Sequence, residues 1–250
     1  KVATLLCIDE VHDGDWTLLF ATNPLNDFTV SFSLVEQNDQ DNMDAFLQAL
    51  KDQGLDVVVA ITDGSPLYKD SLQTWWKDIQ HQLCVFHVIK EVNKLILSGV
   101  RDIKNRIKRQ GNKGRKRRPG RPTKKARQQR QAQKGRTKKE QAAFIWEHQY
   151  LIVKKQENLT DQEEQGLKLM FEIAPELKLF RQFNHQFYRL FQKGITKQQT
   201  RYRHTQMIHN QDYLNNAFLQ KALKKLKKEL FEKMITFLSW ENVERTNNHV

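Results

Sequence analysis

The stretch Asp56-Val57-Val58-Val59-Ala60-Ile61-Thr62-Asp63 decides the fold of this 250-residue chain. Its middle six residues form a continuous, almost wholly apolar run, which is typical of a strand whose two faces are both covered. Gly54 precedes the run, and the turn sequence Asp63-Gly64-Ser65-Pro66 ends it. We therefore expect a central strand of an α/β sheet, with the acidic residue Asp63 at its carboxyl end.

Strand and helix patterns continue on both sides of this run. Upstream, three apolar segments separated by turn signals predict a meander, and a helical stripe follows them. The upstream elements are strands at 2–9, 16–22 and 28–35 and a helix at 40–53. The downstream elements are a helix at 67–79, a short strand at 82–86 and a helix at 87–97. The order β-β-β-α-β-α-β-α is that of an RNase H-like domain, so the predicted fold is an α/β mixed sheet flanked by helices.

Positive charge is concentrated in one segment. The chain has a net charge of +13, and residues 101–139 contain 19 Lys or Arg residues but one acidic residue, Asp102. Such an excess indicates a polyanionic partner. The segment has no apolar periodicity and is rich in Gln, Gly and Pro, so we expect it to be a disordered, DNA-binding insert.

Part of this insert, Arg115-Lys116-Arg117-Arg118-Pro119-Gly120-Arg121-Pro122, resembles an AT-hook. In that motif a Gly-Arg-Pro core lies in the narrow minor groove of A·T-rich DNA. Pro119 stands where the motif usually has an arginine, so nonspecific phosphate binding is the alternative. The residues expected to bind DNA are Arg115, Lys116, Arg117, Arg118, Arg121, Lys124 and Lys125.

Residues 140–238 have helical patterns. Thr160-Asp161-Gln162-Glu163 is a capping box, and two apolar stripes predict the core of a helix bundle. The stripes comprise Phe180, Phe183, Phe187 and Leu190, then Leu214, Phe218, Ala222, Leu223, Leu226, Leu230 and Phe237. The sequence thus predicts an RNase H-like core over 1–100, the basic insert over 101–139 and a helical insertion domain over 140–238. Residues 239–250 are expected to begin a helix.

Two acidic residues occupy corresponding places in the predicted sheet. Asp9 ends the first strand and Asp63 ends the fourth, and these strands are neighbours in an RNase H-like sheet. Clustered carboxylates repel each other unless a cation lies between them, and Mg²⁺ is the cation that best suits carboxylate ligands. A third carboxylate from a separate helix would complete a two-metal site. The alternative for each aspartate is a turn-forming or helix-capping role.

Four short motifs resemble the DDE transposases of bacterial insertion sequences. They are Ile8-Asp9-Glu10, Thr62-Asp63-Gly64-Ser65-Pro66, Cys84-Val85-Phe86-His87 and Asn242-Val243-Glu244-Arg245-Thr246-Asn247-Asn248. The resemblance is to members with a C-x-x-H motif and a helical insertion before the glutamate, and it covers nearly the whole chain. It implies that Asp9, Asp63 and Glu244 are catalytic and hold two Mg²⁺ or Mn²⁺ ions. The 181 residues between Asp63 and Glu244 are explained by the insertion.

The resemblance also implies a reaction, partners and a location. The reaction is hydrolysis of phosphodiesters at transposon ends and strand transfer into target DNA. The protein would act on DNA in the bacterial cytoplasm, at the nucleoid, as a homodimer or higher oligomer. An RNase H-like nuclease or resolvase without strand transfer, and a domesticated inactive DNA-binding protein, are the alternatives. No apolar run approaches the roughly 20 residues that cross a bilayer, so no membrane partner is expected.

Several residues near the expected site have more than one interpretation. Glu241 competes with Glu244 because the two share a helix face, and Asn248 lies one turn after Glu244. Cys84 and His87 belong beside the catalytic pocket by resemblance, where His87 either contacts DNA or packs in the core. A zinc site would need further ligands than these two and the nearby His81. The chain has two cysteines, both in apolar stretches, so no disulfide scaffold is expected.

Overall fold

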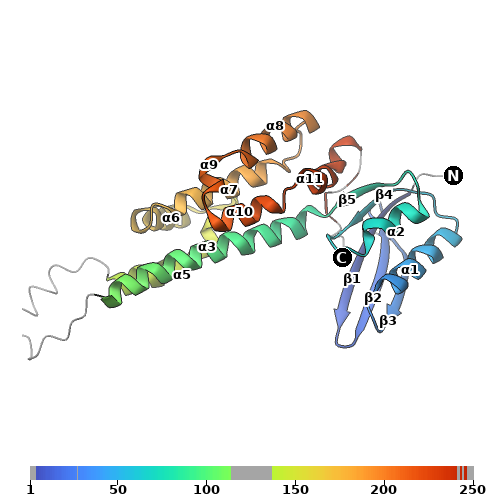
Figure 1. Cartoon of the computed structure of the whole chain (residues 1–250), viewed down its shortest axis with the longest axis horizontal. Helices are drawn as coiled ribbons and strands as arrows, with labels where there is room; N and C mark the ends of the chain where they lie inside the picture. The colour runs from blue at the N-terminus through green and yellow to red at the C-terminus, as the bar shows by residue number, and fades with distance from the viewer. Residues whose placement is uncertain (1–3, 27, 114–136, 241–242, 244, 247–250) are drawn as a thin grey trace, which may run out of the picture. The chain divides into compact units, whose positions relative to one another are not determined.

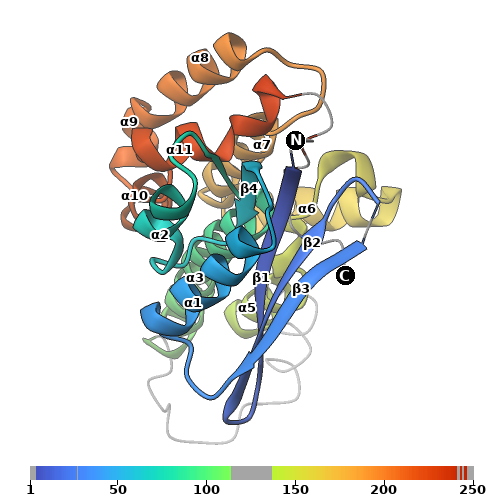
Figure 2. The same cartoon turned by 90° about the vertical axis from the view of Figure 1, so that its right-hand side faces the viewer.

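A five-stranded mixed sheet forms the centre of one part of the chain, as seen in a computed structural model. The structure describes residues 4–26, 28–113, 137–240, 243 and 245–246. The strands are β1 (Thr4–Asp13), β2 (Trp16–Asn23), β3 (Phe28–Val35), β4 (Val57–Thr62) and β5 (Gln80–Leu83). Their order is β3-β2-β1-β4-β5, and Figure 2 shows the first four side by side. β4 runs parallel to β1 and β5, whereas β2 is antiparallel to β1 and β3. This arrangement confirms the predicted RNase H-like fold.

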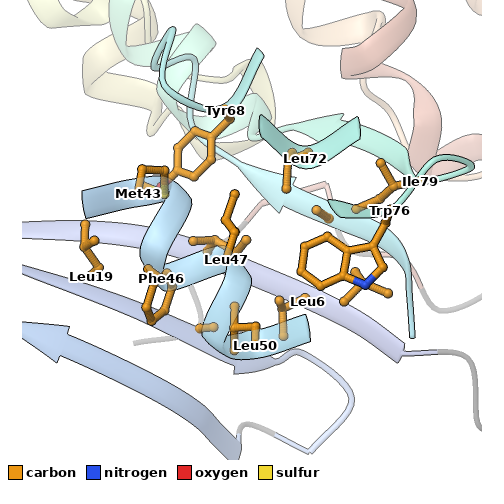
Figure 3. Close-up of a cluster of buried hydrophobic side chains, with 14 residues drawn as sticks. Leu6, Leu19, Met43, Phe46, Leu47, Leu50, Tyr68, Leu72, Trp76 and Ile79 are labelled. Carbon is orange, nitrogen blue, oxygen red and sulfur yellow. The ribbon is translucent and has the colours of Figure 1, made fainter. Parts of the chain in front are cut away.

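One face of the sheet is covered by two helices, α1 (Gln40–Asp52) and α2 (Tyr68–Trp75) (Figure 1). Asp39 begins α1 by accepting a hydrogen bond from the Asn42 amide, so one otherwise unpaired helical N–H group is satisfied. The buried stripe of α1 is the predicted one, and it packs against Leu6 and Leu19 of the sheet. Figure 3 shows this core. The stripe residues are Met43, Phe46, Leu47 and Leu50.

The opposite face of the sheet has a smaller apolar cluster. Leu5 and Cys7 of β1 pack there with Val59 and Ile61 of β4. Val243, which is 8% exposed, joins the same cluster although it follows Ile61 by 182 residues. A late segment of the chain therefore lies on this face of the early sheet.

Contacts divide the chain into two units, which we describe separately. The first comprises residues 1–92, 190–206 and 223–250, and the second comprises 93–189 and 207–222. These boundaries differ from those of the four segments expected from the sequence. Both units are discontinuous because α3 (Val85–Lys113) and α8 (Lys197–Ile208) each begin in the first unit and end in the second.

In the first unit, α11 (Lys228–Met234) and the short helix η3 (Thr236–Ser239) contact β5, an edge strand of the sheet. Gln82, which is fully buried, donates to the Met234 carbonyl at 2.9 Å and accepts from the Phe237 amide at 2.7 Å. This side chain satisfies backbone groups at the end of α11, where helical pairing stops. The edge of the sheet is thus joined to a segment about 150 residues later.

The second unit is helical. Besides the later part of α3, it contains α5 (Lys138–Glu147), η1 (Gln149–Ile152), η2 (Gln156–Asn158), α6 (Asp161–Ile173), α7 (Leu177–Arg189), α9 (Gln211–Leu214) and most of α10 (Ala217–Lys224). The capping box at Thr160 and Glu163 is confirmed. The first predicted stripe is buried, including Phe180 and Phe187. Arg181 is buried with it and donates to the carbonyls of Leu151 and Ile152, which identifies a structural cation.

The disorder expected from residue 101 is wrong for residues 101–113, which are helical. Here α3 continues its buried stripe through Val100, Ile103 and Ile107, at the spacing of a helix face. Lysines and arginines on the remaining faces hid this periodicity in the sequence. Residues 114–136, with the AT-hook-like stretch, lie outside the described residues. Gly111 of α3 lies against Lys138 of α5, so the chain leaves one helix and enters the next at neighbouring points.

The end of the chain also differs from the expectation. The second predicted stripe is divided among α9, α10, a turn at Leu226, α11 and η3. Leu230 is 40% exposed, while Phe231 takes the buried position. The expected helix after residue 239 is not seen at Val243, Arg245 or Thr246. The Arg245 carbonyl instead accepts from the Val85 amide at 2.8 Å, and Val85 is the first residue of α3. No helix among the described residues has both the length and the apolar composition needed to span a bilayer.

Gly99 marks a close approach between helices of the second unit. A β-carbon at this position would overlap the Phe180 ring and lie 3.3 Å from the Phe218 ring. Alanine in a helix interior normally gains up to about 1 kcal/mol over glycine, but forced overpacking costs about 1–3 kcal/mol. We expect Gly99→Ala to lower the melting temperature of the protein. Ser98→Ala, at an exposed position one residue away, is the control and should leave it nearly unchanged.

Candidate functional site

The pairing of β1 with β4 places the two expected catalytic aspartates level with each other. Leu5, Leu6 and Cys7 pair with Val59, Ala60 and Ile61, so partners differ by 54 in number. Continued for two residues, this register brings Asp63 beside Asp9. Because side chains alternate along a strand, both carboxylates belong to the sheet face that carries Cys7 and Ile61. The structure therefore brings Asp9 and Asp63 together at the point where β4 ends.

The sequence suggested that Asp9 is the last residue of its strand, but the strand is longer. β1 continues to Asp13 because it remains paired with β2, where Asp9 lies opposite Phe20. The pairing with β4 stops earlier, at Cys7. Asp9 thus lies where β1 extends beyond its parallel neighbour.

Backbone amides orient both carboxylates. The Ser65 amide donates to Asp63 Oδ1 at 2.7 Å, which closes a turn directly after β4, and the Glu10 amide donates to Asp9 Oδ1 at 3.0 Å. Both aspartates are half-buried. Each bond holds its carboxylate in one orientation, as is usual for carboxylates that bind a cation.

Tyr68 is a residue of this site that the sequence analysis missed. Its side chain is fully buried in α2, and burial raises the pKa of its hydroxyl far above the ordinary value, with further contributions from the charges of Glu10, Asp63 and Asp9. Tyr68 Oη and Glu10 Oε1 are both buried without a well-formed hydrogen bond, although they lie near each other. Asn38 donates to Glu10 Oε2 at 2.5 Å. The sequence around Tyr68 gave no signal of this proximity.

Three described residues near the end of the chain, Val243, Arg245 and Thr246, contact the sheet and the start of α3. Val243 packs on the sheet face of the two aspartates, and the Arg245 carbonyl accepts from the Val85 amide. Thr246 Oγ1 is 3.5 Å from Cys84 Sγ. Glu244 itself, with Glu241 and Asn248, lies outside the part of the chain that the structure describes. The residues on both sides of Glu244 are nevertheless held next to the carboxyl ends of β4 and β5.

Cys84 and His87 lie where β5 passes into α3. The Cys84 amide donates to the Thr62 carbonyl at 2.7 Å, so this buried cysteine is directly adjacent to the residue preceding Asp63. His87, in the first turn of α3, is half-buried, and its Nδ1 atom is buried without a hydrogen-bond partner among the described residues. Neither Cys84 nor Cys7 forms a disulfide bond.

His81 is part of a chain of hydrogen bonds from Lys233 through Thr62 to the Asp63 carbonyl. Its Nδ1 atom is 3.3 Å from Lys233 Nζ, and its Nε2 atom is 2.8 Å from Thr62 Oγ1, which in turn donates to the Asp63 carbonyl at 2.8 Å. Because the lysine ammonium can only donate, Nδ1 accepts and Nε2 carries the proton. Burial, followed by the charge of Lys233, lowers the pKa of His81 to about 3. The ring is therefore neutral and fixes the strand end that carries Asp63.

The donors at this site fit a hard divalent cation. Asp9 and Asp63 supply carboxylate oxygens from adjacent strands, which are the ligands that Mg²⁺ prefers. Among the described residues, no three His, Cys, Asp or Glu side chains are grouped to hold a metal ion. The third carboxylate expected from the sequence, Glu244, comes between the described residues Val243 and Arg245.

The strand order and the aligned acids define an RNase H-like domain with a helical insertion. A family model described as a transposase matches residues 6–250, so the chain belongs to this family of insertion-sequence DDE transposases. No curated protein gives a significant match. Membership in this family makes DNA the partner of the chain.

The neutral state of His81 has a consequence for stability. The unfolded chain binds a proton at the ordinary histidine pKa of 6.5, whereas the folded chain binds it at about 3, so folding stability falls as pH drops below 6.5. This histidine should cost about 1 kcal/mol per pH unit in that range. We expect His81→Gln to weaken the pH dependence of the urea midpoint between pH 7 and pH 5.

The exposed His185 provides the matched control. His185→Gln should retain the wild-type pH dependence over the same range. A His81→Gln variant that lost stability with falling pH as steeply as the wild type would contradict the neutral assignment.

Proposed function

We propose that the chain is the catalytic domain of a DNA transposase, in which Asp9, Asp63 and Glu244 act together. One observation carries the proposal: the β1–β4 register brings Asp63 level with Asp9, and the residues flanking Glu244 dock on the same end of the sheet. Three acidic residues separated by 54 and 181 positions would thereby meet. Glu241 is the competing third acid, and the docked Val243 and Arg245 favour Glu244 because they immediately flank it.

The three carboxylates would hold two Mg²⁺ or Mn²⁺ ions, which activate an oxygen nucleophile and stabilise the leaving oxygen of a phosphodiester when bound. The role of the protein is to fix the acids in place. Amides of Glu10 and Ser65 orient the aspartates, and the chain from His81 through Thr62 holds the end of β4. A preorganised site of this kind accelerates phosphoryl transfer by positioning and charge stabilisation.

The proposed reaction has two steps at the same site. Water first attacks the phosphodiester at a transposon end, and this hydrolysis releases a strand with a 3′-hydroxyl. That hydroxyl then attacks a phosphodiester of the target DNA, so one bond forms as another breaks. Neither step needs a covalent protein intermediate. A strand-transfer assay with a pre-cut end separates this reaction from that of a nuclease or resolvase, which would cut without joining.

The basic residues 114–136 are proposed to bind DNA. They include 11 Lys or Arg residues and no acidic residue, and they connect two helices whose ends, at Gly111 and Lys138, lie against each other. A closely spaced attachment lets the segment follow a DNA backbone without distorting the helices. Phosphate neutralisation by Lys and Arg would supply most of this affinity.

Asp63→Asn and Glu244→Gln should each abolish metal-dependent cleavage, because they remove a charge needed to hold the cations. Each variant should still bind transposon-end DNA with nearly wild-type affinity in EDTA. Cleavage and strand transfer are measured on labelled DNA with Mg²⁺, and metal binding by titration calorimetry should weaken in parallel.

Glu241→Gln is the matched control for Glu244→Gln and should retain cleavage. Loss of cleavage in Glu241→Gln with activity kept in Glu244→Gln would transfer the role to Glu241. Persistent cleavage by Asp63→Asn would refute the acidic triad.

Replacing the 11 basic residues of 114–136 by glutamine should lower DNA affinity and flatten its salt dependence. The slope of log K against log salt changes by about 0.9 for each phosphate that the protein no longer neutralises. Fluorescence anisotropy at several salt concentrations measures both quantities. An unchanged affinity and slope would show that this segment does not contact DNA.

A further inference from the structure

The first unit has a pocket at the edge of the sheet that β5 forms. It has a volume of about 340 Å³ and is lined by residues of α2, β5, α8, α11 and η3. Its polar lining includes Lys197, His81, Glu232, Lys233 and Thr236. This volume is within the range of ligand-binding pockets and exceeds what a lone anion needs. Neither Asp9 nor Asp63 lines it.

The charged groups of the pocket favour an anion. Lys197 and Lys233 enter it from two different helices. Glu232 is the acid in the lining, and Arg201 binds it through two hydrogen bonds of 2.8 and 2.7 Å, which neutralise its charge. His81 contributes no charge because its ring is neutral. The lining therefore carries excess positive charge.

The two lysines are held in position by neighbouring groups. Lys197 donates to Ser239 Oγ at 3.0 Å, and Lys233 lies 3.3 Å from His81 Nδ1. An ammonium group has three donors, so Lys197 can donate to a phosphate oxygen while it keeps its bond to Ser239. The charges are thus placed before any ligand binds, and little side-chain entropy is lost on binding.

We infer that this pocket binds a backbone phosphate of the DNA substrate. The inference rests on DNA being the partner, which follows from the family, and not on the identity of the acidic triad. The pocket is linked to the acid pair through Lys233, His81 and Thr62, the residue before Asp63. The pocket thereby supplies an anchor separate from the basic segment.

The test combines lysine substitutions with single neutral phosphates in the DNA. Lys197→Gln and Lys233→Gln remove the two charges, and Lys225→Gln removes an exposed charge outside the lining as the matched control. Affinities for oligonucleotides carrying one methylphosphonate at successive positions are measured in EDTA, where no cleavage occurs. Melting curves check that every variant is folded.

At one phosphate position, neutralisation should weaken wild-type binding several-fold but have no further effect in Lys197→Gln or Lys233→Gln. Lys225→Gln should respond as the wild type does. Lys233→Gln also changes the bond to His81, so Lys197→Gln is decisive if the former is poorly folded. If a neutral phosphate weakened binding by Lys197→Gln as much as binding by the wild type at every position, the lysine and the phosphate would not be coupled. That result would overturn the inference, whether or not Asp63→Asn cleaves DNA.

A second arm separates a DNA phosphate from a free one. Broadening of the ³¹P signal of inorganic phosphate by the wild type, and not by Lys197→Gln, would indicate a site for a free anion. If that result came without coupling to any DNA phosphate, the pocket would belong to a small anion and the proposal would fail. Coupling to one DNA phosphate supports the proposal whether or not inorganic phosphate binds.

Discussion

The parallel pairing of β1 with β4 is the constraint on which the candidate site depends. The constant difference of 54 between partners holds Asp9 and Asp63 in line, and a slip of one residue would turn one carboxylate to the other face of the sheet. The apolar side chains of the two strands prevent such a slip. Leu6 and Ala60 are buried under α1 and α2, while Cys7 and Ile61 are buried on the opposite face. The register between β1 and β4 thus determines both the packing of the core and the alignment of the two aspartates.

Long-range contacts then complete the end of the sheet. Gln82 joins the edge strand to Met234 and Phe237, and Val85 binds the carbonyl of Arg245. Each contact spans about 150 residues or more, so the helical insertion has to return the chain to the point from which it departed.

The sequence predicted the elements whose apolar patterns were unbroken. The run at Val57–Thr62, the stripe of α1 and the capping box at Thr160 were placed nearly as the structure has them. The helix through 101–113 was missed because its buried positions, such as Ile103 and Ile107, are spread among basic residues. The apolar pattern of a short stretch of sequence does not reveal one buried side of a helix whose other sides are charged.

The site was predictable only in part, for a different reason. Asp9 and Asp63 follow apolar strands, which is a local signal, whereas their alignment depends on a register between distant strands. Tyr68 approaches the acids because α2 folds back over the sheet, and His81 reaches Thr62 across neighbouring strands. Neither contact leaves a mark in the sequence near the residue concerned. Glu244 stays a prediction, supported by the positions of Val243 and Arg245.

The placement of the docked segment has a consequence for the synthesis of this protein. A ribosome completes β1 and β4, with Asp9 and Asp63, long before it reaches Val243 and Arg245. Contacts of such high sequence separation form late, because a long loop must close first. An unfinished polypeptide would thus display two aspartates without the segment that accompanies the third acid. If the proposed function holds, such a partial product could not cut DNA, because one of its three acids would be missing.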